Sequence, residues 1–297
     1  MLISVIIPCH NCLQTIDRAV GSVFSQTFTD WELILVNNNS TDGSWEKLLN
    51  IQKEFPEKSI TVLDEKKKGA PAARNKGLQN AKGEWIQFLD ADDELLSEKI
   101  SHQISLLKTE KDASAIYGQA EIVLSKDHSY TRTIVEDDAW VGLISSKLGI
   151  TSANLFRRAD LLKINGWAEN ISSSQEYDMM FRLLKENKIL IPDNKNLTII
   201  YKIEDSISNT TDKGKLKKII ENRIQLRDNI ISFLKSNSAV TDYRLKAYFS
   251  YKKSEYLKNF ELLPMYVFCK INFTRLDLGL LERLRINKSF LSKLFKR

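Results

Sequence analysis

Three carboxylates follow an apolar run in residues 85–93, which read Trp-Ile-Gln-Phe-Leu-Asp-Ala-Asp-Asp. Asp90 and Asp92 are two residues apart, and Asp93 comes next. Carboxylate oxygens at the end of a strand suit a hard cation, Mg²⁺ or Mn²⁺, which usually takes phosphate oxygens as its other ligands. An acidic loop that caps a helix at Ser97 would explain Asp93, but not Asp90, which ends a run expected to be buried. The segment therefore predicts a metal site beside bound phosphate.

A second polar segment, residues 66–77, reads Lys-Lys-Lys-Gly-Ala-Pro-Ala-Ala-Arg-Asn-Lys-Gly. Small residues at a helix start permit close approach of a ligand, and the free backbone N–H groups there favour anions. Arg74 can contact a carboxylate or a diphosphate. An ion pair between Arg74 and the Asp90 region is compatible with either role. The lysines at 66–68, taken alone, are expected in a solvated turn.

A third segment, residues 174–178, reads Ser-Gln-Glu-Tyr-Asp and precedes an amphipathic helix. The helix dipole favours carboxylates in a first turn, so simple capping is one interpretation. The other is a general base, which needs a carboxylate within reach of an acceptor hydroxyl.

Other chemistries have weaker support. Cys9 and Cys12 form a C-x-x-C that can be a redox dithiol, but the sequence has no second such pair to complete a zinc site, so we expect small buried fillers. The three histidines have no obvious Ser or Cys partner for a hydrolase triad. Absence of G-x-G-x-x-G and G-x-x-x-x-G-K-[ST] from the sequence argues against a dinucleotide oxidoreductase and a P-loop NTPase.

Alternating elements must position these segments. Strands are predicted at 2–8, 31–36, 60–63 and 85–89, and helices at 15–25, 44–55 (with Asp42 as a possible cap), 71–80 and 97–109. This alternation predicts an α/β fold with a mostly parallel sheet flanked by helices. Ligands bind such sheets outside the carboxyl ends of the strands, where the polar segments begin.

Later segments are mixed and then helical. Strands are predicted at 115–124, 152–156 and 197–203, with a helix at 176–187, and further helices at 215–234, 240–260 and 280–295. We expect one domain over residues 1–210 and a basic helical region over 211–297.

Composition is that of an ordinary soluble globular protein. The 297 residues are 42% hydrophobic and 28% charged, and no apolar run approaches the ~20 residues that span a bilayer. The first residues lack a basic start and a cleavage site, so they are expected to form a strand rather than a signal peptide. Three cysteines imply reduced thiols and a cytoplasmic setting.

The order of these motifs resembles glycosyltransferase family 2, and in particular its bacterial surface-polysaccharide enzymes. The resemblance covers about residues 2–210 and rests on five segments in order: 4–8 with Asn11, 40–44, Gly69 with 73–75 and Gly77, 88–93, and 175–178 with 182–183. It implies a GT-A fold, Rossmann-like, and inverting transfer from a nucleotide sugar, most commonly a UDP-sugar.

The resemblance also implies roles for individual residues. Those that bind the donor would be Pro8, Asn11, Asn37, Asn39, Arg74, Asp90, Ala91 and Asp92. Asp90 and Asp92 match the D-x-D pair, with Asp92 the direct ligand of Mn²⁺ or Mg²⁺ on the diphosphate. Glu176 matches the general base. A single inverting displacement needs only one base, plus a Lewis acid for the leaving group.

Three departures from the family pattern stand out. Asn37 and Asn38 occupy a place where the family commonly has Asp, which leaves the nucleobase open. The Glu-Asp motif appears as Gln175-Glu176, so the base would be a longer carboxylate. Glu204 stands where the family often has His, as a metal ligand or as an exposed side chain.

Positive charge is concentrated at the end of the chain. Residues 211–297 carry 20 Lys/Arg against 8 Asp/Glu, whereas residues 1–210 carry 24 against 30. Leucines recur at helical spacing among basic residues in 280–297, the pattern of a helix lying on an anionic membrane surface. A helix packed on the body with snorkelling lysines is the other interpretation. Peripheral attachment would suit a lipid-linked saccharide acceptor, and a homodimer through these helices stays open.

Two rival functions make different predictions. A metal-dependent nucleotidyltransferase would consume a nucleoside triphosphate and release pyrophosphate. A nucleic-acid-binding protein would use the basic helices, but no known reader motif is present in the sequence, so no nucleic-acid partner is expected.

Overall fold

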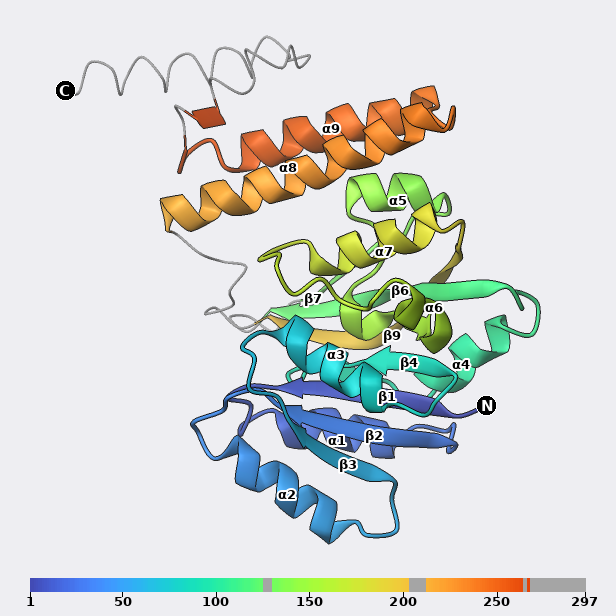
Figure 1. The fold of residues 1–297 in the computed structure, drawn as a ribbon, viewed down its shortest axis with the longest axis vertical. Coiled ribbons are helices and arrows are strands. Elements are labelled where there is room, and N and C mark those ends of the chain that lie inside the picture. Colours follow the sequence, from blue (N-terminus) through green and yellow to red (C-terminus); the bar gives the residue numbers. More distant parts are fainter. Residues whose placement is uncertain (125–129, 203–211, 264–265, 268–297) are drawn as a thin grey trace, which may run out of the picture. The chain divides into compact units, whose positions relative to one another are not determined.

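The structure is a computed structural model that describes residues 1–124, 130–202, 212–263 and 266–267. The chain divides into two compact units, Met1–Glu204 and Asp205–Arg297. The first unit is a sheet flanked by helices, and the described part of the second is helical (Figure 1). The helix predicted at 280–295 lies outside the described residues.

Four parallel strands form the N-terminal half of the sheet. They are β1 (Ile3–Cys9), β2 (Trp31–Asn37), β3 (Ile60–Asp64) and β4 (Trp85–Phe88), in the order β3-β2-β1-β4. β1, β2 and β4 are near-continuous apolar runs because helices cover both faces of a parallel sheet. Cys9 pairs with Asn37, and Asn37 with Asp64, so the carboxyl ends of these strands lie at one edge.

Helices cover this half on both faces. α1 (Ile16–Phe24) and α2 (Ser44–Glu54) share a core with the odd-numbered residues of β1. α3 (Ala70–Asn80) packs on the other face, where Gly77 lies directly against Ile6. Gly69 precedes α3 with a φ of +121°, a conformation that glycine adopts readily. Asp42 accepts hydrogen bonds from the Ser44 backbone N–H and hydroxyl, although the residue directly before α2 is Gly43.

Antiparallel and parallel pairs complete the sheet. β4 pairs with β8 (Leu155–Arg157), β8 with β6 (Ala113–Leu124), and β6 with β9 (Ile189–Lys202), while β5 (Glu94–Leu95) and β7 (Tyr130–Arg132) add to β9 and β6. The accompanying helices are α4 (Lys99–Leu106), α5 (Ala139–Ser145), α6 (Arg158–Lys163) and α7 (Gln175–Lys185). The expected α/β architecture is confirmed.

The prediction of a strand over 152–156 was partly wrong. A 3₁₀ turn, η1 (Thr151–Ala153), comes first, and β8 begins only at Leu155. The Ser152 and Asn154 side chains bond to polar partners of the site described below, so this stretch does not continue the ladder.

The second unit contains a helical hairpin, α8 (Lys213–Ser236) and α9 (Asp242–Lys258). Its core joins Leu216, Ile220 and Ile224 of α8 to Tyr256 of α9. Asp212 and Thr241 cap the two helices by accepting hydrogen bonds from Lys215 N and Arg244 N. Within the described residues, no helix is both long and apolar enough to cross a membrane.

Candidate active site

Asp90 and Arg74 form an ion pair at the carboxyl end of β4. Arg74 Nη2 lies 2.6 Å from Asp90 Oδ1, and the arginine side chain is only 8% exposed. The guanidinium also lies over the Trp167 ring, 4.5 Å from its centroid. The structure therefore brings together these two residues from separate segments, as the sequence had allowed.

Asp93 belongs to the same site and is not a helix cap. It is buried, and it accepts a 2.5 Å hydrogen bond from the Ser152 hydroxyl, which in turn accepts one from the Asp90 backbone N–H at 3.0 Å. α4 begins at Lys99 without a side-chain cap. Burial, and next the Asp90 charge, raise the pKa of Asp93 well above its ordinary value.

Asp92 is a partly buried carboxylate in a negative environment. Burial, and next the neighbouring Asp90, raise its pKa. Arg18 on α1 donates to the Asp92 backbone carbonyl at 2.5 Å and lies over the Tyr201 ring, but no side chain in the described part of the chain donates to the Asp92 carboxylate. A cation would relieve this repulsion.

The donor set fits a hard cation with few protein ligands. Mg²⁺ commonly takes waters and substrate phosphates as ligands beside one or two carboxylates. Asp90 and Asp92 would therefore be enough protein ligands for such a cation. No group of three or more His, Cys, Asp or Glu side chains that could hold a metal occurs among the described residues. Glu204, the third predicted ligand, lies outside them.

Glu176 lies in the first turn of α7, where its side chain is mostly buried. Asn154 Nδ2 donates to Glu176 Oε1 at 2.7 Å. Burial raises the pKa of Glu176 to about 7, although the Asn154 hydrogen bond and the Arg74 charge act in the opposite direction. Ser152 bonds to Asp90 and Asp93, and Asn154, two residues later, bonds to Glu176, so the end of β4 and the first turn of α7 meet at this stretch of chain. A carboxyl group with this pKa can accept a proton near neutral pH.

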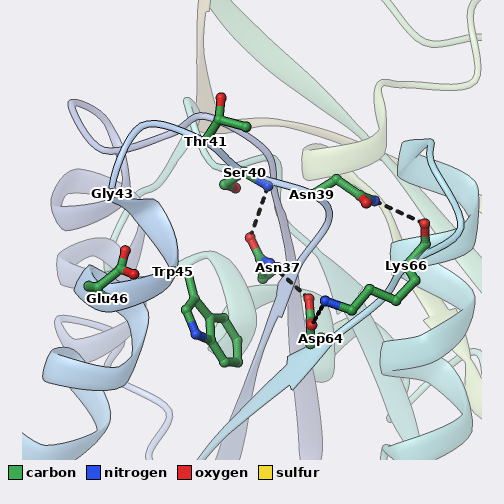
Figure 2. A pocket seen from close by; sticks show the side chains of 9 residues that line it. All are labelled: Asn37, Asn39, Ser40, Thr41, Gly43, Trp45, Glu46, Asp64 and Lys66. Atoms are coloured by element: carbon green, nitrogen blue, oxygen red, sulfur yellow. Dashed lines mark hydrogen bonds and ion pairs between the residues drawn. The ribbon is translucent and has the colours of Figure 1, made fainter.

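A cavity of about 570 Å³ lies beside the loop after β2 (Figure 2). Asn37 Nδ2 donates to Asp64 Oδ1 at 2.8 Å, and Lys66 Nζ lies 2.5 Å from Asp64 Oδ2. The Lys66 contact, the largest cause, and the Asn37 bond lower the pKa of Asp64. The cavity is lined by Asn37, Asn39, Ser40, Thr41, Gly43, Trp45, Glu46, Asp64 and Lys66.

The side chains of Asn37 and Asn38 contact different parts of the structure. Asn37 faces the cavity beside α2, whereas the Asn38 amide binds the loop that leads into α3. Asn38 Nδ2 donates to the carbonyls of Glu65 and Lys67, and its Oδ1 accepts from Gly69 N at 2.8 Å. The Asn38 amide thus holds the loop, which explains an amide in place of a carboxylate.

Two other predicted donor residues bond to the loops after β2 and before α3. Asn11 Oδ1 accepts from Thr41 N at 2.8 Å and so braces the loop after β2. Asn39 donates to the Glu65 carbonyl, in the loop before α3, at 3.2 Å. Asn39 lines the cavity, but Pro8 and Asn11 do not. Ala91 is buried between the two aspartates. The predicted donor residues therefore divide between the cavity and the Arg74–Asp90 cluster.

The sequence interpretation missed Arg18, Ser152 and Asn154. Ser152 and Asn154 are fully buried although polar, and they stand among apolar residues in Thr-Ser-Ala-Asn-Leu-Phe. A buried polar side chain needs a partner, so polar residues in this apolar stretch were the available signal. Cys9 and Cys12 are free and buried, as expected of fillers.

The sequence of this chain is similar to those of known glycosyltransferases. The sequence profile described as Glycosyl transferase family 2 matches residues 4–148. WfgD of Escherichia coli, a UDP-Glc:alpha-D-GlcNAc-diphosphoundecaprenol beta-1,3-glucosyltransferase, is 30% identical over 189 residues, which cover 63% of this chain and 72% of WfgD. WfaP of E. coli, which carries the same enzyme description, is 37% identical over 44% of this chain and 49% of its own. The chain thus spans only about half of WfaP.

Solved structures with the same fold are more distant in sequence. S. aureus TarS 1-349 in complex with UDP-GlcNAc is 16% identical, with 91% of this chain and 83% of that chain covered and a TM-score of 0.60. The mannosyltransferase PcManGT from Pyrobaculum calidifontis, in complex with GDP-Man and Mn2+, is 14% identical, with 98% and 80% covered and a TM-score of 0.63. These likenesses show the GT-A fold. The match to WfgD, together with the family profile, shows that the chain belongs to glycosyl transferase family 2 and is a glycosyltransferase.

Proposed function

We propose that this enzyme transfers a sugar, with inversion, from a nucleoside diphosphate sugar to a lipid-linked saccharide. The observation that carries the proposal is the position of Glu176, a carboxyl group with a pKa of about 7. It accepts from Asn154, two residues after the Ser152 that bonds to Asp90. That arrangement supports a single proton acceptor near the groups that would bind a diphosphate. Together these groups would supply the two functions that a single displacement requires.

Glu176 would take the proton of the acceptor hydroxyl as that oxygen attacks the anomeric carbon. The bond from this carbon to the diphosphate oxygen breaks in the same step, and the nucleoside diphosphate leaves. Because the attack comes from the face opposite the leaving group, the configuration inverts. No second catalytic carboxylate is needed, unlike in a glycosidase.

Asp92 and Asp90 would hold a divalent cation, Mn²⁺ or Mg²⁺. Such a cation, when bound, supplies positive charge that stabilises the leaving diphosphate. Arg74 holds Asp90 in place from the α3 side, and Arg18 holds the backbone of Asp92. Contacts from two arginines thus support the assignment of Asp90 and Asp92 as the D-x-D pair.

The donor is proposed to be a UDP-sugar. WfgD and WfaP are named for UDP-Glc, and TarS was solved with UDP-GlcNAc. Asn37 and Asn39 would face the nucleoside from the loop that Asn11 braces next to Pro8. The names of WfgD and WfaP also include a diphosphoundecaprenol-linked GlcNAc, which supports a lipid-linked acceptor.

A lipid-linked acceptor would bring the enzyme to the cytoplasmic face of a membrane. In the described residues, the start of α8 carries the exposed lysines Lys213, Lys215, Lys217 and Lys218. Basic residues near an anionic surface contribute roughly 1 kcal/mol each. The segment 280–297, predicted to lie on such a surface, is outside the described residues.

A panel of nucleotide sugars tests the proposal. Thermal shift with UDP-glucose, UDP-GlcNAc and GDP-mannose, each with and without Mn²⁺ or Mg²⁺, is expected to show stabilisation by a UDP-sugar that depends on metal. Transfer is then measured with a GlcNAc-diphospholipid, and proton NMR of the product gives the anomeric configuration. Release of pyrophosphate from a nucleoside triphosphate would contradict the proposal and indicate a nucleotidyltransferase. Retention of configuration would exclude the inverting mechanism.

A further inference from the structure

Asn154 is a fully buried amide whose four hydrogen-bonding positions are largely occupied. Its Oδ1 accepts from Gly118 N at 2.9 Å, and its Nδ2 donates to the Leu148 carbonyl at 3.1 Å and to Glu176 Oε1 at 2.7 Å. Gly149 closes the space behind it: a Cβ at Gly149 would lie 2.2 Å from Asn154 Oδ1. The amide therefore has little freedom to move.

These partners fix which end of the amide faces Glu176. The backbone N–H of Gly118 can only donate and the carbonyl of Leu148 can only accept, so rotating the amide by 180° would break both bonds. Asn154 consequently presents a donor to Glu176. A donor at this position favours the ionised carboxylate and occupies Oε1.

We propose that Asn154 is a positioning residue that keeps Glu176 ionised, so that its carboxylate can take the acceptor proton. This inference rests on the proposed role of Glu176 as general base. Burial disfavours the ionised carboxylate, so a fixed donor offsets part of that effect. Without it, a larger fraction of Glu176 would hold its proton at neutral pH, and that fraction could not act as a base.

Other groups around Glu176 contribute in defined directions. Arg74 from α3 favours the ionised form, Asp90 from the end of β4 opposes it, and Thr151 from η1 adds a hydrogen bond that favours it. On α7 itself, Asp178 is paired with Arg182 at 2.8 Å. After burial, the Asn154 hydrogen bond has the largest effect on the pKa of Glu176, and it acts in the opposite direction.

A titration that needs no substrate tests the inference. The protein is labelled with ¹³C at glutamate side-chain carboxyls, and Glu176→Gln identifies the signal of Glu176 by its loss. In Asn154→Ala we expect the Glu176 midpoint to move to higher pH. Transfer activity should fall roughly tenfold at pH values below the new midpoint and recover above it, as for a base of raised pKa. An unmoved or lowered midpoint would overturn the inference.

Gln103→Ala is the matched control. Gln103 is another buried amide, and it donates to the Ala153 carbonyl and to Asp193, both at 3.0 Å, rather than to Glu176. Its loss should lower stability but leave the Glu176 midpoint in place. An equal shift in this variant would mean that general loosening, rather than the donor, moves the pKa.

A second measurement on the unmodified protein covers the case in which Asn154→Ala does not fold. The ¹⁵N side-chain amide signal of Asn154 should show an inflection at the Glu176 midpoint, and that of Gln103 should not. Absence of the Asn154 inflection would also overturn the inference. If Glu176→Gln retains full transfer activity, the proposed function fails instead, whatever Asn154 does to the titration.

Discussion

Glu176→Gln is expected to stabilise the folded protein at alkaline pH while it abolishes sugar transfer. The ordinary pKa of 4.5 is raised to about 7 in the folded state, chiefly by burial. A raised folded pKa means that the folded protein binds the proton more tightly than the unfolded chain. The stability contributed by Glu176 is therefore complete below pH 4.5 and is lost as the pH rises through about 7.

The size of this effect follows from linkage. At about 1.4 kcal/mol for each pKa unit, ionising Glu176 costs the folded state up to about 3 kcal/mol well above pH 7. Glutamine has a similar shape, can still accept from Asn154 and does not ionise. The variant should thus gain about 2–3 kcal/mol over the unmodified protein between pH 5 and pH 8.5.

Urea unfolding followed by tryptophan fluorescence measures this difference. All five tryptophans lie in residues 31–167, so the signal comes from the unit that contains the site. Glu169→Gln is the control with the opposite sign, since Lys67, the largest cause, and Asn75 lower the pKa of Glu169. It should lose stability at high pH and little at low pH. A Glu176→Gln advantage that does not grow with pH would refute the reasoning.

Three other changes have defined outcomes. Asp92→Asn should abolish the Mn²⁺-dependent thermal shift with a UDP-sugar, and a retained metal effect would contradict the D-x-D assignment. The melting temperature without metal should stay unchanged or rise, because the variant removes repulsion from Asp90. Gly83→Ala should lower the free energy of unfolding in urea by about 3 kcal/mol, since its Cβ would lie 2.5 Å from the Ser4 backbone nitrogen. Gly21→Ala in α1, whose Cβ would have nothing within 4 Å, should raise it by up to about 1 kcal/mol, and equal effects of the two variants would be inconsistent with the packing. Arg74→Ala should lower the free energy of unfolding by about 3 kcal/mol, because it leaves Asp90 unpaired and removes the contact with Trp167. Arg74→Lys should restore only part of this stability, and an alanine variant as stable as the unmodified protein would exclude a structural ion pair.

The strands and helices of the first hundred residues could be predicted closely, because their apolar spacing is strong and local. Trp31–Asn37 and Ser44–Glu54, for example, end within one residue of the predicted bounds. Prediction was weaker where burial depends on distant partners. β9 begins at Ile189, eight residues before its predicted start, since its pairing with β6 extends through polar residues that have no strand pattern of their own.

The sequence could propose the D-x-D segment, Arg74 and Glu176 as candidate site residues, because motif order and residue type carry that information. The sequence by itself also determined that the polar segments follow strands, since apolar runs end there. Only the tertiary structure decided that Asp93 bonds to Ser152 and that Asn38 holds a loop. It also decided that Asn154, 22 residues before Glu176, supplies its hydrogen bond. The physical reason is that hydrogen bonding and burial depend on distances across the fold, and spacing along the chain does not contain those distances.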